Sequence, residues 1–449
     1  MRKSFCSIVC FASFFYNTQF IEAITIEEAL IAAFANNWNW KAGGTDEEMA
    51  KLQLDQSSIA FLPSVDGFIN RTRTTGDTDY RNQQIYSIHE NETNLGIRVT
   101  QNVFNGFSTL NQAKAAEFAA KAAKYKTAIS EQELITKVLS AYTGIWAARE
   151  KVKALKKKEE NLHKTLGSQK SALDAGASTA SEVEQANANY QRAVFERTNA
   201  ETELFTAESE FKKLTTLEPD DKIELPTIKF DIPESSDKLI QQAMILNSKI
   251  IYTRLLKEEA EMELKATIGR RAPSVNLSLQ TSKAFDRSST SNSKTRRHQL
   301  SLDVSIPILS NGTGSVPTIP AIQIASEKAK KAEFEMRDTI DEIKKDCIIN
   351  WNTYISANAL IQSSQYAVKS ATISSESNLE ETAMGLKSNT DVWVKENQLL
   401  ESKVDLTNSQ RQKFMASVKL LELCGKLNKG CFIKEKIKKL DQKRVKNVG

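Results

Sequence analysis

Two long stretches of the chain place their apolar residues at alternating steps of three and four positions. They run from about 108 to 175 and from about 183 to 214. The first seam contains Ile145, Ala148, Val152, Leu155, Leu162 and Leu166. Glu159 is the exception in the first seam, and Arg197 interrupts the second. This heptad pattern predicts packed α-helices. A helix of about 68 residues is roughly 100 Å long, which suits a rod rather than a compact domain.

Four short segments alternate with a period of two instead, which predicts β-strands with one apolar and one polar face. They lie at 65–69, 95–100, 275–280 and 300–306. Polar stretches at 74–93 and 285–297 are expected to be the loops of two strand hairpins. Aromatic residues flank the strands at Phe61, Phe68, Phe104, Phe107 and Phe285. Aromatic flanks and long loops are typical of an outer-membrane barrel, although a half-buried soluble sheet alternates in the same way.

The chain also contains an internal repeat. Pro63-Ser64-Val65 recurs as Pro273-Ser274-Val275, an offset of 210 residues (273 − 63), and Gly176 recurs as Gly385, an offset of 209 (385 − 176). Asn105-Gly106 likewise has a counterpart in Asn311-Gly312. Landmarks at a nearly constant offset indicate a duplicated unit of helix, strand hairpin and long helical hairpin.

This repeat predicts the organisation of the chain. The first repeat covers 24–220, with its strand hairpin at 61–104 and its long helical hairpin at 108–217. A proline-containing linker at 221–234 leads to the second repeat at 235–427, with a strand hairpin at 273–308 and a helical hairpin at 321–427. A basic tail at 428–449 follows, and its lysine-rich part at 432–449 is expected to be disordered.

The first 23 residues have the pattern of a secretory signal peptide. Arg2 and Lys3 precede an apolar run over 5–15, and Ala23 supplies a small residue for cleavage. A membrane-anchoring helix is the alternative, but the run is shorter than the roughly 20 residues that span a bilayer. We therefore assign 1–23 to a signal peptide and expect the mature chain to be exported.

Composition narrows the possible functions. Only 16 glycines and 8 prolines in 449 residues imply few turns and long elements. The net charge of +5 comes from interspersed Lys and Glu, so nothing indicates a nucleic-acid partner. Cys424 and Cys431 could pair in an exported chain, whereas Cys347 is expected to be a small packing residue in a helix.

No residue pattern indicates catalysis. The three histidines, His89, His163 and His298, are scattered along the chain. There is no nucleophile–base pair, no phosphate-binding glycine loop and no spacing typical of a metal site. We therefore expect no enzyme activity, no cofactor and no metal.

The four strands indicate that the chain works as an oligomer. In lipid, an open sheet edge leaves unpaired backbone groups that each cost several kcal/mol, so four strands cannot span a membrane alone. Two copies would supply eight strands and three copies twelve, and twelve strands would enclose an aqueous lumen. Polar residues such as Arg98, Ser278 and Asp303 would face that lumen. The predicted fold is mainly α, with long coiled-coil hairpins that extend a membrane β-barrel as a helical tube.

Four motifs resemble the TolC-like family of outer membrane factors. They are the mature start 24–30 with Asn36-Asn37, the segment 99–106, and the turns 176–183 and 385–392. The resemblance covers about 24–427. It implies a homotrimer with a 12-stranded barrel in outer-membrane lipid and a helical barrel in the periplasm. It also implies docking to a periplasmic adaptor and an inner-membrane pump, as the exit channel of a tripartite efflux pump or a type I secretion system.

The resemblance also locates candidate sites at the two turns. Both turns join long helices, so they are expected at the tips of the helical hairpins, with capping boxes at Thr179 and Ser388. Asp391 and Lys387 match residues of the family's periplasmic gate, whereas Val394 and Thr382 depart from its pattern. The adaptor-contact residues implied are Gly176, Ala177, Ser178, Glu182, Gly385, Leu386 and Ser388.

Two other classes of protein share part of the pattern. A periplasmic adaptor has a long helical hairpin, but usually one per chain beside compact β-domains, and here hairpin and strands are duplicated. A structural coiled coil would explain the heptads but not the strand hairpins. Both remain alternatives to the channel at this stage.

Overall fold

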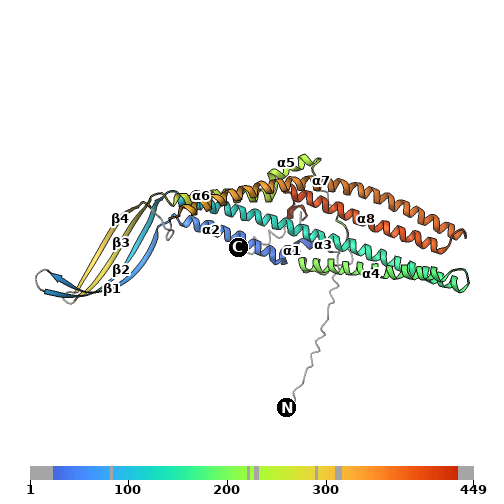
Figure 1. Ribbon diagram of the computed structural model, residues 1–449, viewed down its shortest axis with the longest axis horizontal. Helices are drawn as coiled ribbons and strands as arrows, with labels where there is room; N and C mark the ends of the chain where they lie inside the picture. Colours follow the sequence, from blue (N-terminus) through green and yellow to red (C-terminus); the bar gives the residue numbers. More distant parts are fainter. Residues whose placement is uncertain are drawn as a thin grey trace, which may run out of the picture.

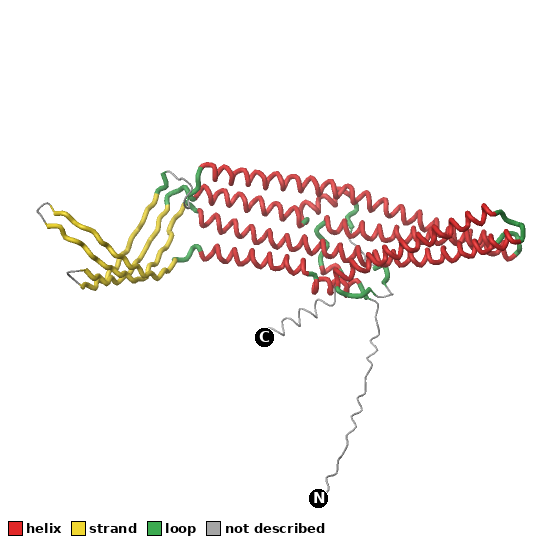
Figure 2. The backbone as a smooth tube through the Cα atoms, turned by 60° about the horizontal axis from the view of Figure 1, so that its bottom comes forward, coloured by secondary structure: helices red, strands yellow, loops and turns green. Residues whose placement is uncertain are grey.

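The computed structural model describes residues 24–80, 84–219, 223–226, 232–288, 292–308 and 316–432. The chain forms a long rod, with a four-stranded sheet at one end and the tips of two helical hairpins at the other (Figure 1). Figure 2 shows long helices running side by side from the sheet toward these tips. The expected signal peptide at 1–23, the Asn311-Gly312 landmark and the tail from 433 onward lie outside the described residues.

The elements follow one another in two similar sets. The first set is α1 (Ile26–Asn36), α2 (Trp38–Ile59), β1 (Ser64–Tyr80), β2 (Gln84–Asn105), α3 (Ser108–Asp174) and α4 (Ala180–Thr215). The second is α5 (Ser236–Leu246), α6 (Ser248–Gly269), β3 (Ser274–Ser288), β4 (Asn292–Ser305), α7 (Ile319–Ala383) and α8 (Asn389–Leu423), with a short 3-10 turn, η1 (Lys429–Cys431), after it. None of the described helices is both long and apolar enough to cross a membrane.

The two sets also agree in length. Helices α1 and α5 have 11 residues each, α2 and α6 have 22 each, and α3 and α7 have 67 and 65. Such agreement in elements about 210 residues apart shows that each half of the chain builds the same unit. Any contact between the halves can therefore be compared with its counterpart.

Matching caps start the helices of each unit. Asn37 ends α1 and opens α2, where its side chain accepts the Trp40 N–H at 3.0 Å. Asn247 repeats this between α5 and α6 and accepts the Ile250 N–H at 3.2 Å. Both asparagines have extended backbone angles, which suit an N-cap but interrupt a helix. The sequence therefore places a corner in each unit at the same position.

The strands form one antiparallel sheet in the order β1-β2-β3-β4. The strands are much longer than the apolar alternation indicated, since β1 reaches Tyr80 and β2 begins at Gln84. The expected loops at 74–93 and 285–297 are therefore wrong, because most of these residues pair in the ladders. The backbones of β1 and β2 stay paired beyond the apolar residues, where both faces of the sheet are largely polar. The hydrophobic pattern therefore does not show where these strands end.

Two apolar clusters hold the middle of the rod together. The first joins α1, α3, α4 and α8, and its fully buried members include Leu30, Val138, Phe211 and Val418. The second joins α5, α6, α7 and α8, through residues such as Leu239, Ile250 and Leu420. Burying one such side chain contributes about 1.5–3 kcal/mol relative to leaving it exposed. Helix α8 contributes to both clusters and so ties the two units to each other.

The two polar residues that break the heptad seams pair with each other. Arg197 on α4 donates a hydrogen bond from Nε to Glu159 on α3, and its Nη1 contacts Glu201 at 2.6 Å. The Arg197 and Glu159 side chains are 26% and 21% exposed. Paired charges of this kind fix helix register, because a shift would leave each charge partly desolvated without its partner.

Cys424 and Cys431 do not pair. Cys424 is fully buried in the second cluster, whereas the Cys431 thiol donates to the Lys426 carbonyl at 3.1 Å and packs against the first cluster. Cys347 is buried in α7, as expected for a packing residue, and burial raises the pKa of its thiol to about 11. None of the three described cysteines forms a disulfide.

The start of the expected C-terminal tail is held against the helices. The Lys429 ammonium lies 4.1 Å from the Phe34 ring centroid and 4.3 Å from that of Trp40. Its backbone N–H donates to Glu131 at 2.9 Å, and Phe432 is buried in the first cluster. Two cation–π contacts and apolar burial thus fix residues up to 432.

Two glycines touch where the strands meet the helices. Gly106 follows β2 with φ +65°, and a Cβ there would lie 2.2 Å from the Gly269 carbonyl oxygen. A Cβ on Gly269 would lie 2.4 Å from the Gly106 carbonyl oxygen. Neither position has room for a side chain, so this junction depends on both glycines.

We predict that Gly106→Ala destabilises the protein by about 2–3 kcal/mol, because it combines a backbone clash with an unfavourable φ. The measurement is denaturant unfolding followed by helical circular dichroism. Gly44→Ala is the matched control, since a Cβ there has nothing within 4 Å and lies inside α2. The control should stabilise by up to about 1 kcal/mol. Equal midpoints for the two variants would contradict the close approach.

Candidate functional site: the hairpin tips and the groove between the hairpins

Each helical hairpin turns on a glycine in the left-handed region. Gly176 has φ +71° and Gly385 has φ +75°. The N–H groups of Ala177 and Leu386 each reach back five residues, to the carbonyls of Ala172 at 2.7 Å and Glu381 at 2.8 Å. This is a Schellman-type ending, in which glycine adopts the left-handed conformation without steric cost. The sequence thus builds the same sharp reversal twice.

Both predicted capping boxes are present at these turns. Thr179 accepts the Glu182 N–H at 3.3 Å, and Glu182 accepts the Thr179 N–H at 2.9 Å. Ser388 and Asp391 repeat the exchange at 3.3 and 3.1 Å. The bond from the Thr179 backbone and that from the Ser178 hydroxyl lower the pKa of Glu182. The Ser388 hydroxyl and backbone lower the pKa of Asp391 in the same way, with a smaller contribution from Lys387.

The two tips differ in one cross-link. In the second tip, Lys387 Nζ lies 2.6 Å from Glu381 and donates to Asn378 at 3.0 Å. In the first tip, the equivalent link runs from the Ser178 hydroxyl to Gln169 at 2.9 Å. Both links close their own hairpin. Of these two links, the one in the second tip uses a cation, and bonding to Lys387 lowers the pKa of Glu381.

The tip side chains are available for contact. Leu386 is 73% exposed and Val394 is 56% exposed, although both are apolar. Ala177, Lys387 and Asp391 are also exposed. All predicted site residues therefore gather at two neighbouring turns at the same end of the rod (Figure 1).

A second set of polar contacts joins the two hairpins to each other and was not foreseen from the sequence. Lys158 on α3 donates to Glu401 on α8 at 2.8 Å and to Glu196 on α4 at 3.1 Å. One turn away, fully buried Asn161 donates to Asn397 at 3.0 Å and to Glu396 at 2.9 Å. Between the tips and the apolar clusters, hydrogen bonds thus take part in holding the hairpins together.

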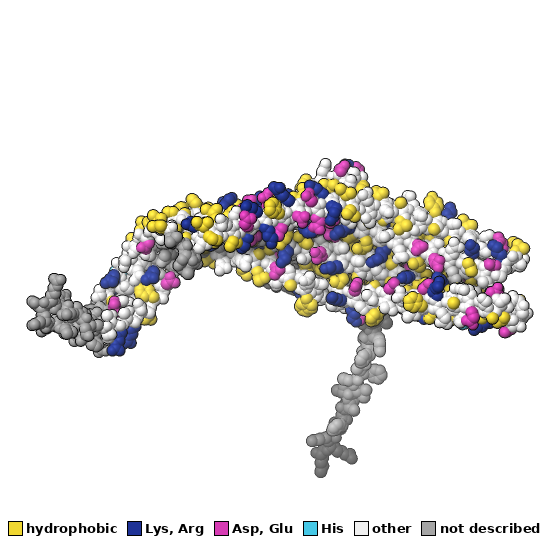
Figure 3. Space-filling model, viewed as in Figure 1, with side chains coloured by type: hydrophobic (Ala, Val, Ile, Leu, Met, Phe, Trp, Pro, Cys, Tyr) yellow, Lys and Arg dark blue, Asp and Glu magenta, His cyan; other side chains and the backbone are white. Residues whose placement is uncertain are grey.

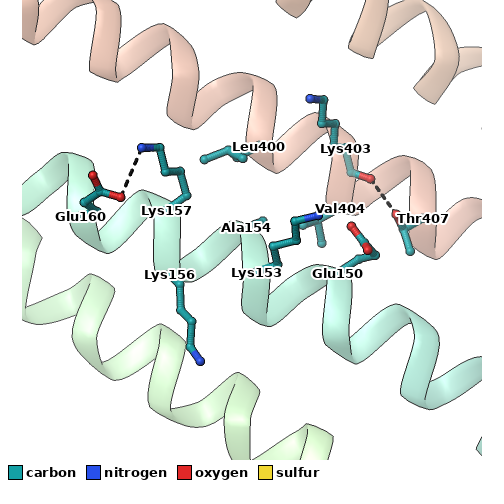
Figure 4. Close-up of a pocket in the computed structure, with 10 residues that line it drawn as sticks. All are labelled: Glu150, Lys153, Ala154, Lys156, Lys157, Glu160, Leu400, Lys403, Val404 and Thr407. Carbon is teal, nitrogen blue, oxygen red and sulfur yellow. Dashed lines mark hydrogen bonds and ion pairs between the residues drawn. The ribbon is translucent and has the colours of Figure 1, made fainter. Parts of the chain in front are cut away.

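A groove of about 510 Å³ lies beside these contacts, between α3 and α8 (Figure 4). Its lining is Glu150, Lys153, Ala154, Lys156, Lys157 and Glu160 from α3, and Leu400, Lys403, Val404 and Thr407 from α8. Lys157 is paired with Glu160 at 3.2 Å, and Lys156 reaches across to Glu201 on α4 at 3.2 Å. Because Lys156 points away toward α4, the groove is lined by three lysines and two glutamates and is slightly positive (Figure 4).

The sequence marks Lys158 and Asn161 as residues that could contact another helix, but it does not identify their partners. Asn161 and Lys158 lie next to seam residues of α3, at positions where a second helix could pack. Only the structure shows that this neighbour is α8, which lies 235 residues later for the Asn161–Glu396 bond. No regular spacing in one sequence encodes such a contact.

The chain is similar in sequence to outer-membrane proteins. The model of the outer membrane efflux protein family matches residues 32–216. The chain is 22% identical over 404 residues to the outer membrane efflux protein BepC of Brucella suis, covering 90% of this chain and 86% of BepC. It is 21% identical to the outer membrane protein TolC of Escherichia coli, covering 88% of this chain and 80% of TolC.

The fold is similar to that of a solved outer-membrane channel. The CmeC outer membrane channel of Campylobacter jejuni superposes with a TM-score of 0.74 at 16% identity, covering 98% of this chain and 97% of CmeC. The expected fold class, long helical hairpins joined to the strands of an outer-membrane barrel, is confirmed.

The class of protein is thereby defined: the chain is built as an outer-membrane channel subunit. Its sequence matches the outer membrane efflux protein family over residues 32–216 and is similar to TolC-like outer membrane factors over most of its length. Its place is the outer membrane, with the helical part in the periplasm. The members of this family are transport channels rather than enzymes.

We predict that the first tip loosens in acid because of Glu182. Its pKa is lowered in the folded tip, so its contribution to stability is present above the ordinary glutamate pKa of about 4.3 and is lost as the pH falls below it. Hydrogen exchange should show protection of the Thr179 and Glu182 amides decreasing over that range. In Glu182→Gln, which keeps the side-chain acceptor, protection should not change with pH. An unchanged pH dependence in the variant would rule out Glu182 as the titrating group.

Proposed function

We propose that the protein is the exit channel of a tripartite efflux or secretion complex, assembled as a trimer that carries small molecules or proteins from the periplasm to the exterior. The observation that carries this proposal is the duplicated unit of two strands and one long helical hairpin in an outer-membrane chain. One chain supplies four strands, and three supply the twelve that enclose a lumen.

The duplication itself supports the assembly. Within the chain, α8 of the second unit packs on α3 of the first, where Phe414 and Leu139 are buried in the first apolar cluster. The equivalent residues 209 positions earlier or later are Phe205 on α4 (414 − 205) and Ile348 on α7 (348 − 139). They are 72% and 48% exposed. The matching contact is thus available only to a neighbouring copy, with α4 of one chain packing on α7 of the next.

Such a contact is head-to-tail and closes a ring when the rotation per unit is right. Six similar units from three chains would alternate around the tube, joined in turn within and between chains. The sheet follows the same order, because β1 and β4 are its edge strands and each would pair with the next copy. Closing the barrel would satisfy the backbone groups that an open edge leaves in lipid.

The gate is proposed at the second tip. Three copies of Asp391, each held by Ser388, would bring carboxylates together where the helices converge. Like charges at a narrow opening repel one another and attract cations. Lys387 would hold its own hairpin closed through Glu381 and Asn378. Here Lys387 bonds within one hairpin, so any link between hairpins in the closed state would need a rotamer change.

The adaptor and the inner-membrane pump are proposed as partners. The exposed tip residues Ala177 and Leu386 offer apolar contacts at the periplasmic end. The relative BepC is named an efflux protein, which supports export of small molecules as the first cargo to examine.

The test of this function is single-channel conductance of the protein in a planar bilayer, after removal of the signal peptide. Uniform conductance steps are expected, because a closed tube has one cross-section. Asp391→Ala should weaken block by multivalent cations by about tenfold, since removing the carboxylates removes most of the local attraction. A protein that never conducts would overturn the channel, whereas conduction with unchanged block would overturn only the gate.

We predict that Phe205→Ser disrupts the assembly. Truncating an aromatic side chain at the centre of an interface costs about 2 kcal/mol or more. A trimer would lose three such contacts. The measurement is the molar mass in neutral detergent by light scattering, expected to fall from a trimer to smaller species. Phe205→Leu, which keeps an apolar side chain, should remain trimeric. A fully trimeric Phe205→Ser protein would show that α4 is not at the interface.

A further inference from the structure

The charged residues of the sheet are sorted by face. The paired rows Val65–Val99–Leu279–Leu300 and Ile69–Leu95–Lys283–Arg296 lie on one face, because the register matches them across all four strands. Side chains two apart on a strand share a face. The same face therefore also carries Arg71 and Arg73 on β1 and Lys294 on β4. We name these five bases, Arg71, Arg73, Lys283, Lys294 and Arg296, the basic belt.

No acid accompanies these bases among the described side chains of this face. The acids Asp66, Glu92 and Asp303 lie on the opposite face, together with Arg98 and Arg297. On the opposite face, Arg98 donates to Gln280 at 3.0 and 2.9 Å.

The apolar rows identify the outward side. Val65 is 66% exposed, Leu300 is 70% and Ile69 is 81%, so this face has no cover in the chain. In a barrel the exposed apolar face contacts lipid and the polar face lines the lumen. The basic belt therefore points outward, on the surface that meets the membrane. Figure 3 shows Lys and Arg side chains together with Asp, Glu and apolar ones on the strand end of the rod, in a view of one side of the molecule.

The position of the basic belt along the strands gives its depth relative to the membrane. On β4, apolar Val304, Leu302 and Leu300 come first from the helical end, and Arg296 follows. From Val304 to Arg296 the strand rises about 27 Å, which is about 20 Å of height at a tilt of about 40°. An outer-membrane apolar band is about 25 Å tall. The belt thus lies at the far edge of the hydrocarbon, on the exterior side.

We propose that the basic belt binds the phosphate-bearing headgroups of anionic lipid in the outer leaflet. Lys and Arg side chains at this depth extend toward the headgroups, and each base near an anionic lipid surface contributes attraction that salt screens. The Lys283 ammonium lies 5.0 Å from the centroid of the Phe285 ring. A cation and an aromatic ring thus lie together at the height of the headgroups, where aromatic residues of a barrel gather. The inference rests on the proposed barrel and adds a lipid partner to it.

The test uses the full-length protein in neutral detergent and lipid A as the probe, with binding followed by native mass spectrometry. Diphosphoryl lipid A should bind about tenfold more tightly than the dephosphorylated lipid, and the preference should weaken as salt rises. The belt variant carries Arg71→Gln, Arg73→Gln, Lys283→Gln, Lys294→Gln and Arg296→Gln. It should lose that preference.

Two further variants serve as controls. Arg98→Gln with Arg297→Gln removes two charges from the opposite face and should bind as the unaltered protein does. Arg71→Lys, Arg73→Lys and Arg296→Lys keep the charge and should retain the preference. Equal binding by the belt variant, or no phosphate preference in the unaltered protein, would overturn the proposal. Conductance of the same samples separates the outcomes, since a conducting protein without lipid preference refutes only the lipid site.

Discussion

The edge strands β1 and β4 set the main constraint on this molecule. Each presents a row of backbone groups without a partner in the chain's own sheet order. In lipid such groups must be paired, because no water is available to them. The apolar outward rows of the sheet make lipid the environment in which this condition applies. A partner copy is therefore part of the fold, and the helices have to allow the same closure.

The helices meet that condition through duplication. Since α3 has α8 beside it within the chain, α7 has a matching but uncovered face, and Phe205 on α4 has an uncovered counterpart of buried Phe414. The first unit thus leaves strand β1 and helix α4 without a neighbour, and the second unit leaves strand β4 and helix α7 without one. Two independent parts of the chain specify one head-to-tail neighbour, which is stronger support than either alone.

Along the rod, the kind of contact between the hairpins changes. Near the middle, α8 packs on α3 through fully buried apolar residues such as Val138 and Val418. Toward the tips, Lys158–Glu401 and Asn161–Asn397 take over, beside a positively charged groove. Apolar packing is lost steeply with separation, whereas polar groups that move apart can bond to water instead. The tips are therefore the part that can move at least cost while the middle stays fixed.

The sequence by itself determined much of the local structure. The heptads placed α3 and α4, the turn glycines and capping boxes at Thr179 and Ser388 were read correctly, and the period-two segments located the sheet. These features depend on neighbours within a few residues. The strand ends could not be read, because β1 and β2 continue through polar residues whose pairing leaves no hydrophobic pattern.

Only the tertiary structure decided which distant residues meet. Glu159 and Arg197 looked like two separate faults in the heptads and are in fact partners across a hairpin. Cys424 and Cys431 are close in sequence yet face different clusters, so proximity along the chain did not make a pair. The lysines of the groove and the bases of the belt become single surfaces only once register and helix packing are fixed. Which charged side chains share a surface depends on the faces of helices and strands, and these faces form only when the chain folds.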